Sequence, residues 1–165
     1  SDSGYEVTRT ADLSRCPACG SCPVASITRT INSTPGHRYL HCSLCAGEWH
    51  RVRTDCTHCS SSRSLAYQSL DHALADSGDV AADDAARSTL TAIQAETCDD
   101  CNHYLKIMHT DRDPMIEVGA DDLASITLDL LIAETGKRRY GRNLMLLFAN
   151  ESASSTEAPP DPGAT

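Results

Sequence analysis

Eight cysteines in this sequence form four pairs with the spacing Cys-x-x-Cys. The pairs are Cys16/Cys19, Cys42/Cys45, Cys56/Cys59 and Cys98/Cys101. A Cys-x-x-Cys turn places two sulfurs against one ion and points its inner backbone N–H groups at those sulfurs, so two turns complete a tetrahedral site. Secreted disulfide frameworks usually space their cysteines irregularly. The regular spacing therefore favours two four-cysteine metal sites over disulfides.

The lengths of the connecting segments indicate how the four pairs combine. Joining the first two pairs encloses 22 residues, 20–41, and joining the last two encloses 38 residues, 60–97. Both segments are long enough for a hairpin that folds back, whereas a nested arrangement would join the second and third pairs across ten residues, 46–55. We predict the sequential pairing. The ten-residue bridge then keeps the two ions within about 33 Å of each other.

The spacing does not select the metal. Four thiolates in a tetrahedron suit zinc or a rubredoxin-type iron centre, so the predicted cofactors are two tetrathiolate ions, iron or zinc. The turn "CPACG" carries a glycine directly after its second sulfur, where rubredoxin-like turns favour a positive φ. The turns "CSLCAG", "CTHCSS" and "CDDCNH" lack that glycine.

Other residues near the turns have less specific patterns. Cys22 extends the first pair to three evenly spaced cysteines, but no fourth follows nearby, so a structural or free thiol is favoured over an iron–sulfur ligand. Because four cysteines already fill each site, the nearby histidines are predicted to lie at the surface or to support the ligands. These are His41, His50 and His58. Trp49 is predicted to lie in the core between the sites.

Several arginines flank the same turns. We interpret them as offsetting the negative charge of the thiolate centres, in preference to binding phosphate. They are Arg38, Arg51, Arg53 and Arg63. The basic segment "KRRYGR" follows the predicted helix, where cations suit the negative end of its dipole.

Composition limits the class of protein. Only 4% of the 165 residues are aromatic, so a large core is not expected and metal should supply part of the stability. The net charge of −9 argues against nucleic acid as a partner. No signal peptide is evident and no apolar run could span a bilayer, so we expect a soluble protein without membrane insertion. The chain begins with Ser1 rather than Met, which is consistent with a fragment.

Local patterns predict short strands and one helix. Strands are expected at 24–30 and 37–40, on either side of the turn "NSTPG", then in "GEWHRVR", at 64–71, in "STLTAIQAETCDDC" and in "YLKIM". The helix is expected in "VGADDLASITLDLLIAETG", with Asp121 or Asp122 as its cap and Gly136 as its end. Its apolar stripe would be Leu123, Ile126, Leu130 and Leu131.

These elements predict a small metal-bound α+β protein, with two tandem rubredoxin-like or zinc-ribbon subdomains and a C-terminal helix. The first ribbon is expected over 15–55 and the second over 56–112, the latter including an Asp-rich loop at 71–86. The helix, within 113–149, would pack on the ribbons. A flexible lead-in at 1–14 and a disordered tail at 150–165 are expected to flank them.

Four segments together resemble the formate dehydrogenase accessory protein family, FdhE. They are, in order, "CPACGSCPVAS", "RYLHCSLCAGEWHRVRTDCTHC", "AETCDDCNHYLKI" and "DRDPMIEVGADDLASITLDLL". The resemblance covers about Arg15 to Leu147, and four ordered matches are far more specific than any single Cys-x-x-Cys. It departs from the family pattern at Cys22, at Asn102 where Gly is expected, in a longer Asp-rich loop, and in the absence of an N-terminal helical domain.

The resemblance implies a role in enzyme maturation. Members of the family look like a helical domain followed by two rubredoxin-like subdomains, and they carry metal, reported as iron, on their Cys-x-x-Cys pairs. They act in the cytoplasm on the molybdenum-containing catalytic subunit of respiratory formate dehydrogenase before its export. By this resemblance the metal ligands are Cys16, Cys19, Cys42, Cys45, Cys56, Cys59, Cys98 and Cys101.

We therefore expect a non-enzymatic accessory factor that binds this catalytic subunit; no oligomeric state is predicted. The alternative is a rubredoxin-like redox protein that acts on the client or its cofactor site. A nucleic-acid-binding zinc ribbon is disfavoured by the acidic charge. The face around Trp49, Arg51 and Arg53 is the predicted client contact, because the bridge combines apolar and cationic side chains.

Overall fold

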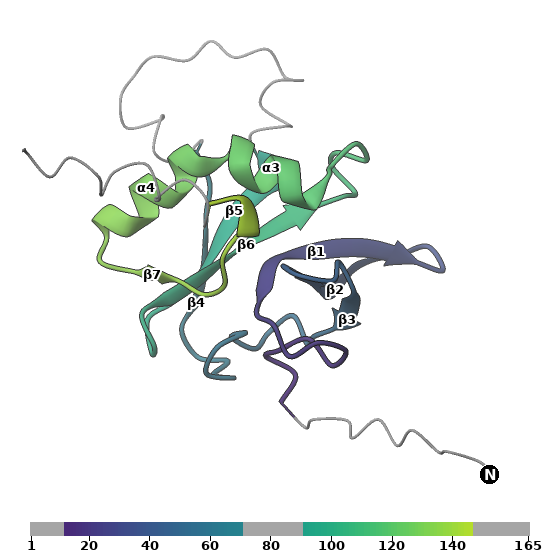
Figure 1. The fold of residues 1–165 in the computed structure, drawn as a ribbon, viewed down its shortest axis with the longest axis horizontal. Coiled ribbons are helices and arrows are strands. Elements are labelled where there is room, and N and C mark those ends of the chain that lie inside the picture. Colours follow the sequence, from purple (N-terminus) through teal and green to yellow (C-terminus); the bar gives the residue numbers. More distant parts are fainter. Residues whose placement is uncertain (1–11, 71–90, 147–165) are drawn as a thin grey trace, which may run out of the picture.

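The computed structural model describes residues 12–70 and 91–146 (Figure 1). The predicted Asp-rich loop, the predicted tail and most of the predicted lead-in lie outside these residues. In chain order the elements are β1 (Pro23–Ile31), β2 (Thr34–Cys42), β3 (Glu48–His50), β4 (Leu65–Gln68), β5 (Ile93–Cys98), β6 (His103–His109), α3 (Val118–Ala124), α4 (Ile126–Glu134) and β7 (Arg138–Arg139).

The strands form one sheet of seven strands with the order β3-β2-β1-β6-β5-β4, and β7 pairs with β6 beside this path. Each half is an antiparallel unit, β1 with β2 and β3 in the first and β4 with β5 and β6 in the second. The halves join through a parallel pairing of β1 with β6, where Ser26, Ile27 and Thr28 face Ile107, Met108 and His109. The predicted tandem ribbons are therefore present, but they share a continuous sheet.

The connection between β1 and β2 is shorter than predicted. Asn32 and Ser33 form the turn with φ of 49° and 65°, values that suit the twist of a two-residue hairpin. Thr34 already pairs with Ile31, so the predicted turn residues Thr34–Gly36 belong to β2. The register shifts beyond this point, and Gly36, with φ of 88°, occupies the irregularity without a steric penalty.

The core is divided among small clusters that follow the sheet. One contains Val24, Ala25, Ile27, Met108 and Val118, and thus spans the seam between the halves. A second contains Ala95, Tyr104, Leu128 and Ile132, and holds α4 on the second half. Both helices lie on the same side of the sheet (Figure 1). A third cluster, Cys16, Leu40, Cys42, Trp49 and Leu105, lies at the first pair of cysteine turns. These modest clusters agree with the low aromatic content.

The single predicted helix is two helices. Ser125 lies between them with φ −98° and ψ 27°, and its hydroxyl donates to the carbonyl of Asp121, 2.6 Å away. The predicted apolar stripe is also wrong: Ile126 and Leu130 are exposed, whereas Leu128 and Ile132 are buried. Glu117 is the N-cap residue of α3 and accepts from the N–H of Ala120. The predicted Asp121 contributes by accepting from the backbone N–H of Glu117, at 2.7 Å. Gly136 does follow α4 with φ of 79°, as predicted for the end of the helix.

A buried cluster of charges lies between the helices and the second half of the sheet. The ammonium of Lys106, with no exposed side-chain surface, is 2.6 Å from a carboxylate oxygen of Asp129 and 3.3 Å from one of Asp122. The guanidinium of Arg139 pairs with both aspartates. Asn143 donates to Asp122, and the hydroxyl of Tyr104 donates to Asp129. Two cations and two anions thus balance, so Arg139 of the basic segment takes part in local ion pairs. The favourable effect of the segment on the helix dipole stays a prediction.

His109 is a second buried titratable group. Its Nε2 is 2.9 Å from the side-chain oxygen of Gln94, so Nε2 carries the hydrogen of the neutral ring. Burial, helped by the positive charge of Arg112, lowers the pKa of His109 to about 4, although Asp111 acts in the opposite direction. The folded protein therefore favours the neutral ring at pH values where an exposed histidine is protonated.

We expect this histidine to weaken the fold in mild acid. An unfolded histidine has a pKa near about 6.5, so between that value and 4 the unfolded chain binds a proton that the folded protein does not. The free energy of unfolding should fall by about 2 kcal/mol between pH 7 and pH 5 from this group. Urea unfolding of the protein and of His109→Gln at both pH values measures it. Equal pH dependence in the two proteins would contradict the assignment.

Within the described ranges, no helix is both long and apolar enough to cross a membrane.

Candidate metal centres

The four turns bring eight sulfurs together in two groups. The first contains Cys16, Cys19, Cys42 and Cys45, and the second contains Cys56, Cys59, Cys98 and Cys101. Within each group all ligand atoms lie within 4.8 Å of one another. This grouping is the sequential pairing that the segment lengths predict. Cys22 belongs to neither group, in agreement with its interpretation as a separate thiol.

The distances between sulfurs fit a metal and do not fit disulfides. Cys16 and Cys45 are 3.6 Å apart and Cys19 and Cys42 are 3.4 Å apart. In the second group, Cys56 and Cys101 are 3.7 Å apart and Cys59 and Cys98 are 3.8 Å apart. A disulfide bond requires a sulfur–sulfur distance of about 2.05 Å. Four sulfurs placed at about 2.3 Å around a tetrahedral ion lie about 3.8 Å from one another, so both groups could hold one ion.

Backbone hydrogen bonds shape the turns. The N–H groups of Cys16, Cys42 and Cys56 donate to the carbonyls of Ser21, Gly47 and Ser61 over 2.8–2.9 Å. Inside the second turn, the N–H groups of Leu44 and Cys45 point at the sulfur of Cys42, at 3.4 and 3.5 Å. These donors would stabilise a thiolate there, as the sequence pattern predicts for such turns.

All four turns place a left-handed residue directly after the second cysteine. Gly20 has φ of 74°, and the three positions without glycine have nearly the same conformation. Their values are 56° at Ala46, 59° at Ser60 and 54° at Asn102. The turn geometry therefore imposes a positive φ even where the sequence lacks the favourable residue, and Ala46 carries the steric cost of its Cβ.

Ala46→Gly should stabilise the protein by about 0.5–1 kcal/mol, because glycine removes the left-handed penalty and part of that gain is offset by its freer unfolded chain. Urea unfolding at saturating metal measures the change. Ala46→Val is the matched control, since a β-branched residue is least tolerant of positive φ and should destabilise the protein. The explanation fails if both variants shift stability in the same direction.

Burial differs between the sulfurs of one group. Cys16 and Cys42 are buried, whereas Cys19 and Cys45 are exposed. Hydrogen bonds from the backbone N–H and the hydroxyl of Ser21 lower the pKa of Cys19 to about 6, whereas burial raises the pKa of Cys42 to about 12. An entering cation would therefore meet an ionised thiolate at the surface and would displace protons from the buried thiols.

Polar side chains brace the second group. The guanidinium of Arg51 donates to the carbonyl of Cys56 at 3.0 Å and to the hydroxyl of Ser60 at 2.8 Å. Asp100 accepts from the hydroxyls of Ser61 and Ser64, and so links the third turn to the fourth. The side chains that anchor this group thus include a residue from the bridge between the two halves.

Arg38 ties the two halves together. This β2 residue is buried and forms an ion pair with Glu96 of β5, with 2.7 Å between nitrogen and oxygen. It also donates to the hydroxyl of Thr57 at 2.6 Å and to the carbonyl of Asp55 at 3.0 Å. Arg38 and Arg51 therefore bond to carbonyls, hydroxyls and a carboxylate in the structure. Both were predicted to offset thiolate charge, and these hydrogen-bonding roles were not predicted.

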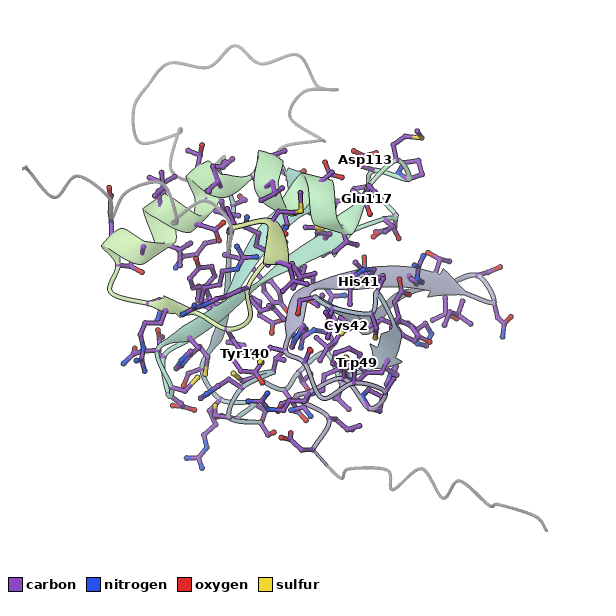
Figure 2. All side chains as sticks on the ribbon, viewed as in Figure 1. His41, Cys42, Trp49, Asp113, Glu117 and Tyr140 are labelled. Carbon is purple, nitrogen blue, oxygen red and sulfur yellow. The ribbon has the colours of Figure 1, made fainter. Side chains whose placement is uncertain are left out.

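The predicted client face is only partly exposed: Arg53 is exposed, whereas its other two residues are buried. Trp49 is 7% exposed and Arg51 is 8% exposed. Trp49 packs with Cys16, Cys42 and Leu105, close to the first group (Figure 2), and its indole donates to the carbonyl of Leu13. It is core, as predicted, and its cluster joins two cysteines of the first group to Leu105 of β6 in the second half. Trp49 and Arg51 therefore cannot form the predicted contact, and a contact through Arg53 stays a prediction.

The histidines divide into two kinds. His41 lies 3.4 Å from the carboxylate of Glu48, and His50 meets the ring of Tyr39 edge-on, so neither joins a ligand group. His58 stacks on His103 beside Cys101, and burial followed by repulsion from His103 lowers the pKa of His58. His103 was not among the predicted residues. The spacings Cys56-x-His58 and Cys101-x-His103 could have indicated the pair.

The fold and the two groups define an α+β protein built from two ribbon halves, each with four cysteines that could bind a metal ion. The family model described as "FdhE, central domain" matches residues 15–53, and the one described as "FdhE, C-terminal domain" matches residues 54–146. The chain belongs to the FdhE family.

Comparison with known proteins supports membership of the FdhE family. The chain is 43% identical over 147 residues to a "Protein FdhE homolog" of Haemophilus influenzae, covering 89% of this chain and 43% of that protein. It is 47% identical over 131 residues to "Protein FdhE" of Escherichia coli K12, covering 79% of this chain and 37% of that one. The crystal structure of the FdhE protein from Pseudomonas aeruginosa matches with a TM-score of 0.67 and 44% identity, covering 84% of this chain and 43% of that one. The chain thus spans about two fifths of the length of these relatives.

Proposed function

We propose that the eight paired cysteines bind two metal ions and that the protein is an accessory factor for formate dehydrogenase, which binds the catalytic subunit without itself catalysing a reaction. Membership of the FdhE family supports the accessory role. The sulfur distances of 3.4–3.8 Å carry the metal part of the proposal, because uncoordinated thiols have no reason to converge in fours at that spacing.

The bound ions would act as structural cross-links. The described core clusters are small, and one of them includes two of the paired cysteines themselves. Four thiolates and one divalent ion carry about −2 charges per site, which adds to the chain's own −9. The proposed cofactor is iron or zinc, and family resemblance favours iron.

Exposed apolar residues are better candidates for client contact than the buried Trp49 and Arg51 of the bridge. Leu44, between Cys42 and Cys45, is 61% exposed at the tip of the second turn. Apolar side chains that stand out from a rigid turn lose little entropy on binding. We assign Leu44 to the contact with the catalytic subunit.

Pull-down with purified catalytic subunit of formate dehydrogenase tests the contact. Leu44→Asp should weaken capture at least about tenfold, since a buried carboxylate opposes an apolar contact. An aspartate fits the turn, because Asp100 occupies the equivalent position in the fourth turn. Leu130→Asp on α4 is the matched control, with 62% exposure, and should bind normally. No capture of the subunit by the unaltered protein would refute the proposed function.

The rubredoxin-like redox protein is the second candidate, supported by the exposure of Cys19, Cys45 and Cys59. Exposed thiolate ligands give electrons a short path to a partner. Metal analysis and the absorption spectrum of anaerobically purified protein separate the two candidates. Zinc, or iron without a reversible couple, supports the accessory role, whereas iron with a reversible couple supports the redox role.

A further inference from the structure

Two imidazoles and a sulfur converge at the edge of the second group. A ring nitrogen of His58, a ring nitrogen of His103 and the sulfur of Cys101 all lie within 4.8 Å of one another. The rings stack with centroids 4.0 Å apart and an angle of 16°. Nitrogen and thiolate ligands of this kind are those that zinc and related cations prefer.

The hydrogen bond made by one ring nitrogen of His103 leaves the lone pair of the other ring nitrogen available to bind a cation. Its Nδ1 lies 2.7 Å from the carbonyl oxygen of Cys101, and a carbonyl can only accept, so Nδ1 carries the hydrogen. The lone pair of the neutral ring is then on Nε2. A carbonyl that holds the far nitrogen of an imidazole is also the usual support of a metal-binding histidine.

The surroundings leave room and hold the rings in place. The edge of Tyr140 faces His58, with centroids 5.0 Å apart, and faces His103 at 6.5 Å. These three residues, together with Cys56, line a small pocket. Tyr140 is labelled in Figure 2, near the end of β7. His58 itself is exposed, so a cation can reach the site from solvent.

We propose that His58, His103 and Cys101 form a third cation site, with Cys101 bridging to the ion of the second four-cysteine group. This inference rests on the proposed binding of that ion. A metal-bound thiolate keeps lone pairs that can serve a second cation, and the surplus of about −2 charges on a tetrathiolate site attracts one. Three protein ligands leave the fourth position open, so the third ion binds more weakly than the others and exchanges with solution.

The first half provides an internal comparison. The positions equivalent to His58 and His103 are Ala18 and Gly47, which have no metal-binding side chain. The third site is therefore specific to the second half, and a chain with both groups filled should bind three ions rather than two or four.

Equilibrium dialysis of the whole chain against buffered Zn²⁺, with metal analysis, tests the proposal. The protein should bind two ions tightly and a third more weakly. His58→Gln and His103→Gln should each keep the two tight ions and raise the Kd of the third at least about tenfold. His41→Gln, a histidine next to a cysteine of the first group, is the matched control and should keep all three.

The outcomes separate this inference from the function on which it rests. Fewer than two tight ions in the unaltered protein would refute the metal role of the cysteines. Two tight ions with no third, or a third ion that survives both substitutions, would overturn the present inference alone. Loss of a tight ion in His58→Gln would make the histidine a ligand of the four-cysteine group, and would also overturn it.

Discussion

Cys45→Ser should lower the metal content from two tightly bound ions per chain to one. Cys45 is exposed, so the substitution removes a proposed ligand without leaving a cavity. Binding of a structural zinc ion can supply about 10–16 kcal/mol, far more than the small core beside this site could replace. The turns of the first half should lose their order, and the thermal midpoint should fall sharply. Metal analysis and thermal unfolding followed by circular dichroism measure both effects.

Cys22→Ser is the matched control, because Cys22 lies in the same half but in neither group. It should retain both ions. The second group should also keep its ion in Cys45→Ser, since all four of its cysteines lie on the other two turns. Loss of both ions from Cys45→Ser would mean that the sites fold as one unit, and retention of both would exclude Cys45 as a ligand.

Lys106→Met should destabilise the protein by about 3–5 kcal/mol. Removal of this ammonium leaves the buried Asp122 and the half-buried Asp129 with one guanidinium between them, and an uncompensated buried charge is costly. The loss should appear as a lower midpoint of urea unfolding at pH 7 without a change of slope.

An exposed ion pair supplies the control for Lys106. Arg29 and Glu48 are 2.7 Å apart, the same close range, but the side chain of Arg29 is 47% exposed. Arg29→Met should therefore cost less than about 1 kcal/mol. If Lys106→Met and Arg29→Met lower the free energy of unfolding by similar amounts, burial of the charge cluster does not explain the destabilisation by Lys106→Met.

The cysteine groups were predictable because their signal is local. Each Cys-x-x-Cys pair closes its own turn, and segment length then decided which turns met, so the sequential pairing followed from counting residues. The left-handed conformation of Ala46, Ser60 and Asn102 was not predictable from residue type. It is imposed by the turn, which overrides the weak preference of each residue.

The helices and the bridge were harder because their burial depends on partners distant in sequence. The buried face of α4 is set by Tyr104 and Ala95 of the sheet, and α3 buries Asp122 because Lys106 and Arg139 neutralise it. The burial of Arg38 was hard to predict for the same reason, because its partner Glu96 becomes a neighbour only after the sheet has formed. Arg51 differs, since it donates to the carbonyl of Cys56 only five positions along the chain. Hydrophobic periodicity contains no information on such pairs.

The parallel seam between β1 and β6 has a consequence for synthesis on the ribosome. Ser26 and Lys106, which are hydrogen-bonded across it, are 80 positions apart in the chain. The edge of β1 that pairs with β6 is therefore synthesised long before β6. Until β6 emerges, the backbone groups of this edge are unpaired, although all four cysteines of the first group are already available to bind an ion. Early metal capture would hold β1 and β2 in register during that interval and limit wrong strand pairing with neighbouring nascent chains. Metal starvation should then reduce the yield of folded protein more than it reduces the stability of protein already made.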